Sequence, residues 1–330
     1  MIVGDRVVVP LTSGVIAARA LADGEDVWSA AIVPSGPLTA GDQVIVVPAG
    51  MVIQGLDVVT GRTRWRAETG TLTAPLLVRG GWVIAVGDGR IMAFRERDGS
   101  PVWSHEFGLV ERRPTADGDM LFLPLKEGRV VALNLLDGKT IWETPPLGSD
   151  PSEPLAAGGR VYVQADGALL CLHAKSGYLE WPFKIGASIV GTLVVDDDNI
   201  YMAAMDNQIW TFDRDNGERK KTDDLRYRPI GSPILIGNAV LVPGRVASLA
   251  IYDTRTLKER SKLALPDPVL TGVASGVMPG NGAAVLALIT NSLGKPYTLR
   301  VLGPPPPGLP ALQPLTVLPG SPLTISLPGR

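Results

Sequence analysis

The residues of this chain that are best suited to chemistry are few, and they lack the companions of a catalytic or metal site. The chain has two histidines, His105 and His173, and one cysteine, Cys171. A zinc site needs several nitrogen or sulfur ligands in one place, and neither histidine has a companion at ligand spacing. No serine or cysteine nucleophile can be paired with a base from the sequence alone. The sequence therefore predicts no catalytic residues and no metal site.

One acidic run, Asp196-Asp197-Asp198-Asn199, has side chains that calcium prefers. It lacks the spaced ligands of a calcium loop, and it falls where other parts of the chain have a Gly-Asp or Gly-Asn turn. We therefore expect a solvated turn between two strands. The segment Gly87-Asp88-Gly89 is a turn by the same comparison, because no helix follows it to bind a phosphate.

The elements that carry these residues recur along the chain with a period near 40. Glycines preceded by turn-forming residues mark the units, and Leu257 is next in phase. These glycines are Gly24, Gly61, Gly99, Gly138, Gly177 and Gly217. Four residues after each of the first five stands a tryptophan: Trp28, Trp65, Trp103, Trp142 and Trp181. A fixed period of this length indicates a repeat architecture.

Each repeat is predicted to be four short strands with no helix. The position six residues before the turn glycine carries a small side chain, so Cys171 is expected to be a buried space-filler. The position four before it is mostly polar, which makes His173 a turn-facing residue. Four-stranded units of about 40 residues that pack face to face are the blades of a β-propeller.

We expect eight blades, with seven plus an appendage as the alternative. Seven units are clear, and Ala284–Thr290 with its neighbours Thr271–Ser275 and Tyr297–Leu302 supplies three strands of an eighth. The propeller is predicted to span residues 1–302. Residues 303–330 contain nine prolines and form a predicted tail, from which Leu315–Leu318 or Leu323–Leu327 would supply the closing strand.

Composition excludes several classes of protein. The net charge is −2, without the surplus of Lys and Arg that marks a nucleic-acid-binding protein. No stretch of about 18 apolar residues is present, so no transmembrane segment is predicted. The N-terminus does not have the pattern of a signal peptide. Because the first repeat begins at residue 1, we expect that the chain is truncated at its N-terminus.

The repeat resembles that of the pyrroloquinoline-quinone (PQQ) propeller family, A-x-D-x-x-T-G-x-x-x-W. Leu56-Asp57-Val58-Val59-Thr60-Gly61-Arg62-Thr63-Arg64-Trp65 carries the resemblance, and Ala132 to Trp142 is similar. One branch of the family comprises quinoprotein dehydrogenases with bound PQQ and calcium. The other comprises non-catalytic propellers, including BamB-type lipoproteins of outer-membrane assembly, and sensor domains. This chain is shorter than the enzymes and has one cysteine, so it lacks the adjacent cysteine pair that many of them hold against the quinone.

The resemblance to the non-catalytic branch implies a binding scaffold without a cofactor, located outside the cytoplasm or in the periplasm. A PQQ-dependent dehydrogenase, or a fragment of one, is the alternative, and a sensor domain of a larger protein is a further one. We expect a monomer whose partner is a protein or peptide. The five tryptophans are predicted to dock each blade on the next. Mixed charges in the loops between blades suggest a partner-binding face with Arg112, Arg113, Arg226, Tyr227 and Arg228.

Overall fold

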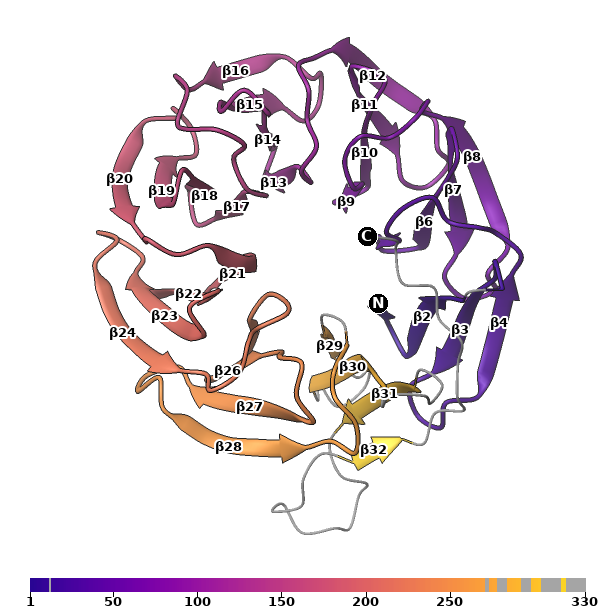
Figure 1. The fold of residues 1–330 in the computed structure, drawn as a ribbon. Helices are drawn as coiled ribbons and strands as arrows, with labels where there is room; N and C mark the ends of the chain where they lie inside the picture. Colours follow the sequence, from indigo (N-terminus) through magenta and orange to yellow (C-terminus); the bar gives the residue numbers. More distant parts are fainter. Residues whose placement is uncertain (12, 271–272, 278–283, 292–297, 304–315, 319–330) are drawn as a thin grey trace. The chain divides into compact units, whose positions relative to one another are not determined.

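The computed structural model describes residues 1–330 except 12, 271–272, 278–283, 292–297, 304–315 and 319–330. Every regular element among the described residues is a β-strand, and the strands form eight antiparallel sheets of four strands each. Within each sheet the strands stand in chain order (Figure 1). Repeated four-stranded meanders of this kind are the blades of a β-propeller. The prediction of an all-β propeller with eight blades is confirmed.

The described chain forms two compact units, which we call the middle unit and the terminal unit. The middle unit is Ile32–Gly186, and the terminal unit is Met1–Ala31 together with the described part of Ala187–Arg330. Each unit contains four blades. The first blade of the chain thus belongs with the last three.

The middle unit consists of the second to fifth blades of the chain. Their strands are β5 (Thr39–Ala40), β6 (Val44–Ala49), β7 (Val52–Asp57) and β8 (Thr63–Glu68); β9 (Leu77–Arg79), β10 (Trp82–Gly87), β11 (Arg90–Arg95) and β12 (Pro101–Glu106); β13 (Thr115–Asp117), β14 (Met120–Pro124), β15 (Val130–Asn134) and β16 (Thr140–Glu143); and β17 (Leu155–Ala157), β18 (Arg160–Ala165), β19 (Ala168–His173) and β20 (Leu179–Lys184).

The terminal unit consists of the first blade and the sixth to eighth. Their strands are β1 (Ile2–Val3), β2 (Arg6–Pro10), β3 (Ile16–Ala20) and β4 (Asp26–Ala30); β21 (Ile189–Val195), β22 (Asn199–Ala204), β23 (Gln208–Asp213) and β24 (Arg219–Asp224); β25 (Ile234–Ile236), β26 (Ala239–Val242), β27 (Ser248–Asp253) and β28 (Glu259–Ala264); and β29 (Ala274–Val277), β30 (Ala284–Thr290), β31 (Thr298–Gly303) and β32 (Thr316–Leu318).

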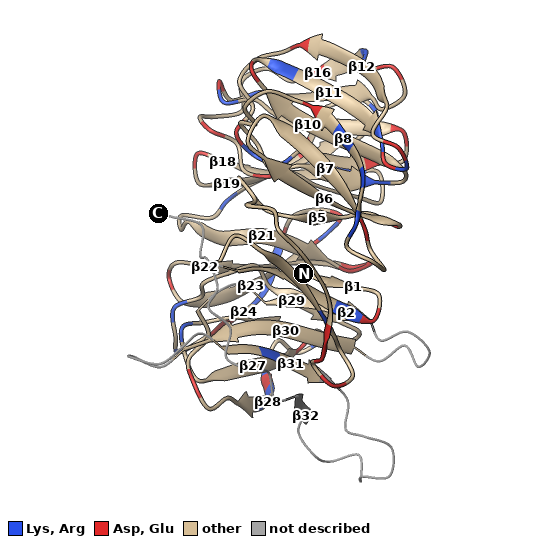
Figure 2. Ribbon diagram, turned by 90° about the vertical axis from the view of Figure 1, so that its right-hand side faces the viewer, with Lys and Arg blue, Asp and Glu red and all other residues tan. Residues whose placement is uncertain are grey.

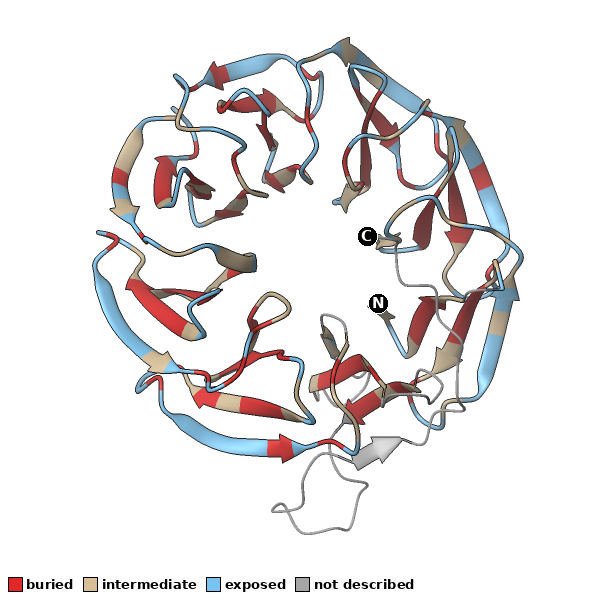
Figure 3. Ribbon diagram, viewed as in Figure 1, coloured by how far each residue is buried: buried red, intermediate tan, exposed pale blue. Residues whose placement is uncertain are grey.

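Burial differs between the strands of one blade in a way that follows from their sequences. The second and third strands, such as β14 and β15, are buried along most of their length, because they are covered on both faces. The fourth strand is mostly exposed and polar, as in β24 with the sequence RKKTDD (Figure 3). Charged side chains on such an edge strand discourage pairing with another chain.

The turn between the third and fourth strands depends on the glycine and on the polar residue four positions before it. Gly61 has φ +70° and donates its N–H to the carbonyl of Asp57 (2.9 Å). The carboxylate of Asp57 accepts hydrogen bonds from the N–H groups of Val59 (3.0 Å) and Thr60 (2.7 Å). The pairing register shifts by one residue beside this turn. The repeated Asp and Gly are therefore a local turn motif.

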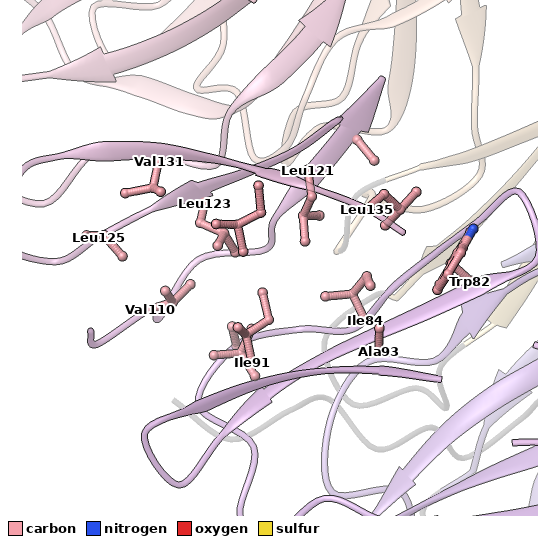
Figure 4. Close-up of a cluster of buried hydrophobic side chains, with 14 residues drawn as sticks. Trp82, Ile84, Ile91, Ala93, Val110, Leu121, Leu123, Leu125, Val131 and Leu135 are labelled. Carbon is pink, nitrogen blue, oxygen red and sulfur yellow. The ribbon is translucent and has the colours of Figure 1, made fainter. Parts of the chain in front are cut away.

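Neighbouring blades within a unit share hydrophobic clusters. Figure 4 shows one in the middle unit, where Ile84 and Ile91 of one blade meet Leu121 and Leu123 of the next. All four side chains are at most 1% exposed. Burying a side chain of this size stabilises a fold by about 1.5–3 kcal/mol. In the terminal unit a comparable cluster joins the first and last blades.

The eighth blade confirms most of the predicted strands and extends beyond residue 302. Strand β30 has the predicted bounds, and β31 continues to Gly303. Its fourth strand, β32, is antiparallel to β31 with Val317 opposite Leu302. The other predicted closing strand, Leu323–Leu327, lies outside the described residues, as does most of 303–330. The division into a propeller at 1–302 and a tail stays a prediction.

Candidate functional site

Three of the tryptophans that we expected to dock the blades bridge neighbouring blades of the middle unit. In each case the indole N–H donates to a backbone carbonyl that lies three residues before the turn glycine of the next blade. The bonds run from Trp65 to Glu96 (2.8 Å), from Trp103 to Leu135 (2.9 Å) and from Trp142 to Ala174 (2.7 Å). The indole therefore fixes the position of the following turn.

The rings lie so close to the turn glycines that no side chain fits between them. A Cβ added at Gly99 or Gly177 would stand 2.5 Å from a ring carbon of Trp65 or Trp142. These glycines also have φ of +68° and +69°, a conformation that other residues rarely adopt. On the tryptophan's own blade, a Cβ at Gly55 would stand 2.2 Å from the Trp65 ring. The small residue and the turn glycine thus form the two walls of an indole slot.

The other two predicted docking tryptophans, Trp28 and Trp181, have the same place in their own sheets. Trp28 lies opposite Ala18, and Trp181 lies opposite Cys171, both in the small-residue position. Trp28 is half-buried, whereas Trp181 is 8% exposed. Within the described residues the indole nitrogen of Trp181 has no hydrogen-bond partner. A docking role for these two stays a prediction.

Arg112 and Arg113 form a charged surface on two loops of the middle unit, which we call the Arg112 surface. The Arg112 guanidinium lies 2.7 Å from the carboxylate of Asp150, and Arg113 lies 3.8 Å from that of Glu153. Burial raises the pKa of Glu153, and the two arginines oppose that rise. Each pair joins the loop before one blade to the loop before the next.

Arg226 and Arg228 belong to the terminal unit, on the loop after β24. Both are exposed, and Arg226 has a left-handed backbone with φ +57°. The guanidinium of Arg228 lies 3.3 Å from the sulfur of Met205, a side chain that is 46% exposed. Figure 2 shows acidic and basic residues interspersed over the loops and strand edges.

Tyr227 is not part of an exposed face, which corrects our expectation. The side chain is 8% exposed, and its hydroxyl donates to the carbonyl of Val242 (2.8 Å). Leu225 and Pro229 are buried as well, whereas the arginines between them are exposed. This alternation is that of an extended segment with one face on the core. The sequence contains the alternation, and it could have identified Tyr227 as a core residue.

The cysteine and the two histidines lie in two strands, His105 in β12 and the other two in β19. Cys171 is buried in the small-residue position, and its sulfur lies 3.8 Å from the carboxylate of Glu180. His105 lies in β12, and its ring stacks on Trp103 with centroids 5.5 Å apart. His173 contacts the hydroxyl of Ser176 (3.0 Å) across its own turn.

The acidic run at residues 196–199 is the turn between β21 and β22, as predicted. One carboxylate oxygen of Asp196 accepts hydrogen bonds from the N–H groups of Asp198 and Asn199, and the other accepts one from the hydroxyl of Tyr201 (2.7 Å). In the described part of the chain no group of three or more His, Cys, Asp or Glu residues could hold a metal ion. The same residues include no helix that is long and apolar enough to cross a membrane.

Known proteins of similar sequence and structure support the family assignment. The chain is 29% identical to the outer membrane protein assembly factor BamB of Burkholderia pseudomallei over 73% of this chain and 69% of that protein. The crystal structure of BamB from Moraxella catarrhalis superposes with a TM-score of 0.68 at 21% identity, covering 88% and 89% of the two chains. Quinohemoprotein alcohol dehydrogenase from Comamonas testosteroni shares the fold at 12% identity, with a TM-score of 0.66 and coverage of 88% and 70%.

A family model described as outer membrane protein assembly factor BamB matches residues 12–152 and 126–271 of this chain. The matched residues cover most of the blades and include all five tryptophans of the repeat. The predicted resemblance to BamB-like PQQ-type propellers is confirmed. The chain belongs to the family of the outer membrane protein assembly factor BamB, whose repeat is of the PQQ type.

Proposed function

We propose that this protein is a non-catalytic binding scaffold that takes part in outer membrane protein assembly by binding another protein. The observation that carries the proposal is the match of the BamB family model to residues 12–152 and 126–271. The relative from Burkholderia pseudomallei has the same description, and the alignment with this chain covers 69% of its length. We further propose that the protein works in the periplasm, as a monomer and without PQQ or calcium.

The Arg112 surface is the place where we expect a partner to bind in the middle unit. Arg112 and Asp150 have about half of their side-chain area exposed, at 52% and 48%. The surface therefore offers both signs of charge in a fixed arrangement. Arginines that are held in place lose less conformational freedom on binding than free side chains do. Exposed ion pairs contribute only about 0–1 kcal/mol to folding, so this one can be changed without unfolding the protein.

The experiment compares capture of protein partners by the wild-type chain and by the Arg112→Glu/Arg113→Glu variant. Bait protein is incubated with a detergent extract of the cells that produce it, and bound proteins are identified by mass spectrometry. The matched control is Arg97→Glu, which reverses an arginine with 82% exposure on a turn of the same unit. Circular dichroism of each variant shows whether the fold is retained.

We expect a partner that the wild type and Arg97→Glu both capture and that Arg112→Glu/Arg113→Glu does not. The same partner set for all three proteins would contradict binding at the Arg112 surface. The matching substitutions Arg226→Glu and Arg228→Glu test the loop of the terminal unit in the same way.

Reconstitution with PQQ and calcium separates the scaffold from the dehydrogenase alternative. A scaffold leaves the absorption spectrum of PQQ unchanged and reduces no electron acceptor when alcohols are added. A stoichiometric chromophore with alcohol-dependent turnover would replace the proposal by the enzyme.

A further inference from the structure

The sixth blade breaks the pattern of tryptophans at a defined place. Four residues after its turn glycine stands Lys221 instead of tryptophan. Lys221 lies opposite Thr211 in the sheet, just as Trp142 lies opposite Ala132 in its own blade. The ammonium group of Lys221 donates to the backbone carbonyl of Arg255 in the seventh blade. The lysine thus keeps the hydrogen bond between neighbouring blades but supplies no ring.

The facing turn of the seventh blade has changed in a complementary way. Leu257 takes the place of the turn glycine and keeps the left-handed backbone, with φ +54°. Its side chain is 1% exposed and belongs to the hydrophobic cluster between these blades. In the middle unit a Cβ at the equivalent Gly99 would collide with the indole. By the same geometry, leucine at this position requires that the ring be absent.

A polar pocket of about 320 Å³ occupies this part of the terminal unit. Its lining includes three cations, Lys220, Lys221 and Arg255, three acids, Asp198, Asp213 and Asp215, and the hydroxyl residue Thr211. Asp213 is already satisfied, because it pairs with Lys220 (2.9 Å) and accepts hydrogen bonds from the N–H groups of Asp215 (2.8 Å) and Asn216 (3.1 Å). This carboxylate therefore has little capacity left for a ligand.

Hydrogen-bond donors of the pocket remain unused. Thr211 is 2% exposed, and its hydroxyl has no partner within the described structure. Among the described residues the ammonium group of Lys221, with three N–H bonds, has one acceptor. The Arg255 side chain is exposed and makes no hydrogen bond or ion pair with the described residues. An unpartnered buried hydroxyl is costly, and two cations beside it favour a negatively charged ligand.

We propose that this pocket binds the anionic oxygen group, a carboxylate or a phosphate, of a ligand, with Lys221, Arg255 and Thr211 as donors. The site is independent of the partner surface proposed above. It lies where the sixth blade has Lys221 in the position of the tryptophan. The anion is either free in solution or carried by an acidic side chain of a peptide.

The test is isothermal titration calorimetry with inorganic phosphate, and separately with a short peptide of aspartate and glutamate with blocked termini. Ionic strength is kept constant with chloride. The variants are Arg255→Ala, Lys221→Met and Thr211→Val, which removes the hydroxyl and keeps the volume. The matched control is Arg97→Ala, because Arg97 has the same position in its turn as Arg255 but faces a slot that Trp65 fills.

We expect saturable binding that weakens by about tenfold in Arg255→Ala and in Lys221→Met, since each variant loses a charge-assisted hydrogen bond. Binding to Arg97→Ala is expected to match the wild type. Saturable binding of phosphate identifies a free anion, and binding of the peptide alone identifies an acidic side chain. The absence of saturable binding by both probes, or equal weakening in Arg97→Ala, would overturn the proposal.

A second variant tests the origin of the pocket. Lys221→Trp combined with Leu257→Gly restores the indole and glycine pair of the other blades. We expect this variant to fold and to lose binding of both probes, because the ring fills the pocket. Retained binding in a folded Lys221→Trp/Leu257→Gly protein would also overturn the proposal.

Discussion

The hydrogen bond and the close contact that join Trp142 to the following blade predict a measurable coupling. Trp142 is 9% exposed, it packs on Phe122 with centroids 5.8 Å apart, and its N–H bonds to Ala174. Trp142→Ala removes the ring and leaves that carbonyl without its donor. Truncation of a large buried side chain costs about 3–5 kcal/mol. Trp142→Phe retains part of the ring and is expected to cost about 1–3 kcal/mol, mainly for the carbonyl.

Gly177→Ala provides the second arm of a double-mutant cycle. In the wild type the new methyl group would stand 2.5 Å from the Trp142 ring and would also strain the left-handed backbone at φ +69°. In the Trp142→Ala protein only the backbone strain of about 1–2 kcal/mol remains. The two substitutions together should therefore cost less than the sum of their separate effects, by about 0.5–3 kcal/mol.

The control for backbone strain is Gly159→Ala. Gly159 has a similar φ of +78°, but a Cβ there would meet nothing within 4 Å. Urea unfolding followed by far-ultraviolet circular dichroism gives the free energy of each variant, with the slope compared to detect stepwise unfolding of the two units. Additive effects of Trp142→Ala and Gly177→Ala, or a Trp142→Ala protein as stable as the wild type, would refute the docking argument.

Three further results are expected. Lys221→Trp alone is expected to lower the thermal unfolding midpoint, because the ring would collide with Leu257. Adding Leu257→Gly is expected to restore the midpoint. A midpoint that Lys221→Trp leaves unchanged would argue against room for an indole only when glycine faces it. Partial desolvation raises the pKa of Asp57, but hydrogen bonds from Thr60 and Arg64 outweigh it and lower the pKa to about 2. The stability that Asp57 contributes is thus present above its unfolded pKa of about 4 and is lost as the pH falls toward 2. In Asp57→Asn the free energy of unfolding should therefore fall less steeply between pH 4 and about pH 2 than in the wild type. An equally steep fall in the variant would contradict this contribution of Asp57. Tyr227→Phe should cost about 1 kcal/mol in urea unfolding because it removes a buried hydrogen bond, with partner capture unchanged; loss of capture by a stable variant would return Tyr227 to the binding face.

The repeat made most of the fold predictable, because the strand pattern can be recognised in the sequence of each blade separately. Glycine with a polar residue four positions earlier is a local turn signal, so the third and fourth strands are located without tertiary information. The alternation of Leu225, Tyr227 and Pro229 was also local, but we interpreted this loop from its charges and so placed Tyr227 on the surface. Burial here depends on which side of a short extended segment meets the core.

The candidate sites were less predictable for a different reason. That Lys221 stands in the tryptophan position and Leu257 in the glycine position is visible in the sequence. The pocket itself is not visible there, because its lining comes from two different blades that only the fold brings together. The ion pair between Arg112 and Asp150 likewise joins loops that precede different blades.

The sequence separation between each indole and its acceptor has a consequence for how the chain folds during translation. The acceptors of Trp65, Trp103 and Trp142 follow 31 or 32 residues later in the chain, a delay of about 2–6 s at 5–20 residues per second. The middle unit can therefore close progressively behind the growing end. The first blade cannot be covered in this way, because Val7 and Val9 are buried against Val285 and Val301. Its apolar surface therefore stays uncovered until residues 285–301 have been synthesised, so the first blade is a segment that a chaperone would protect.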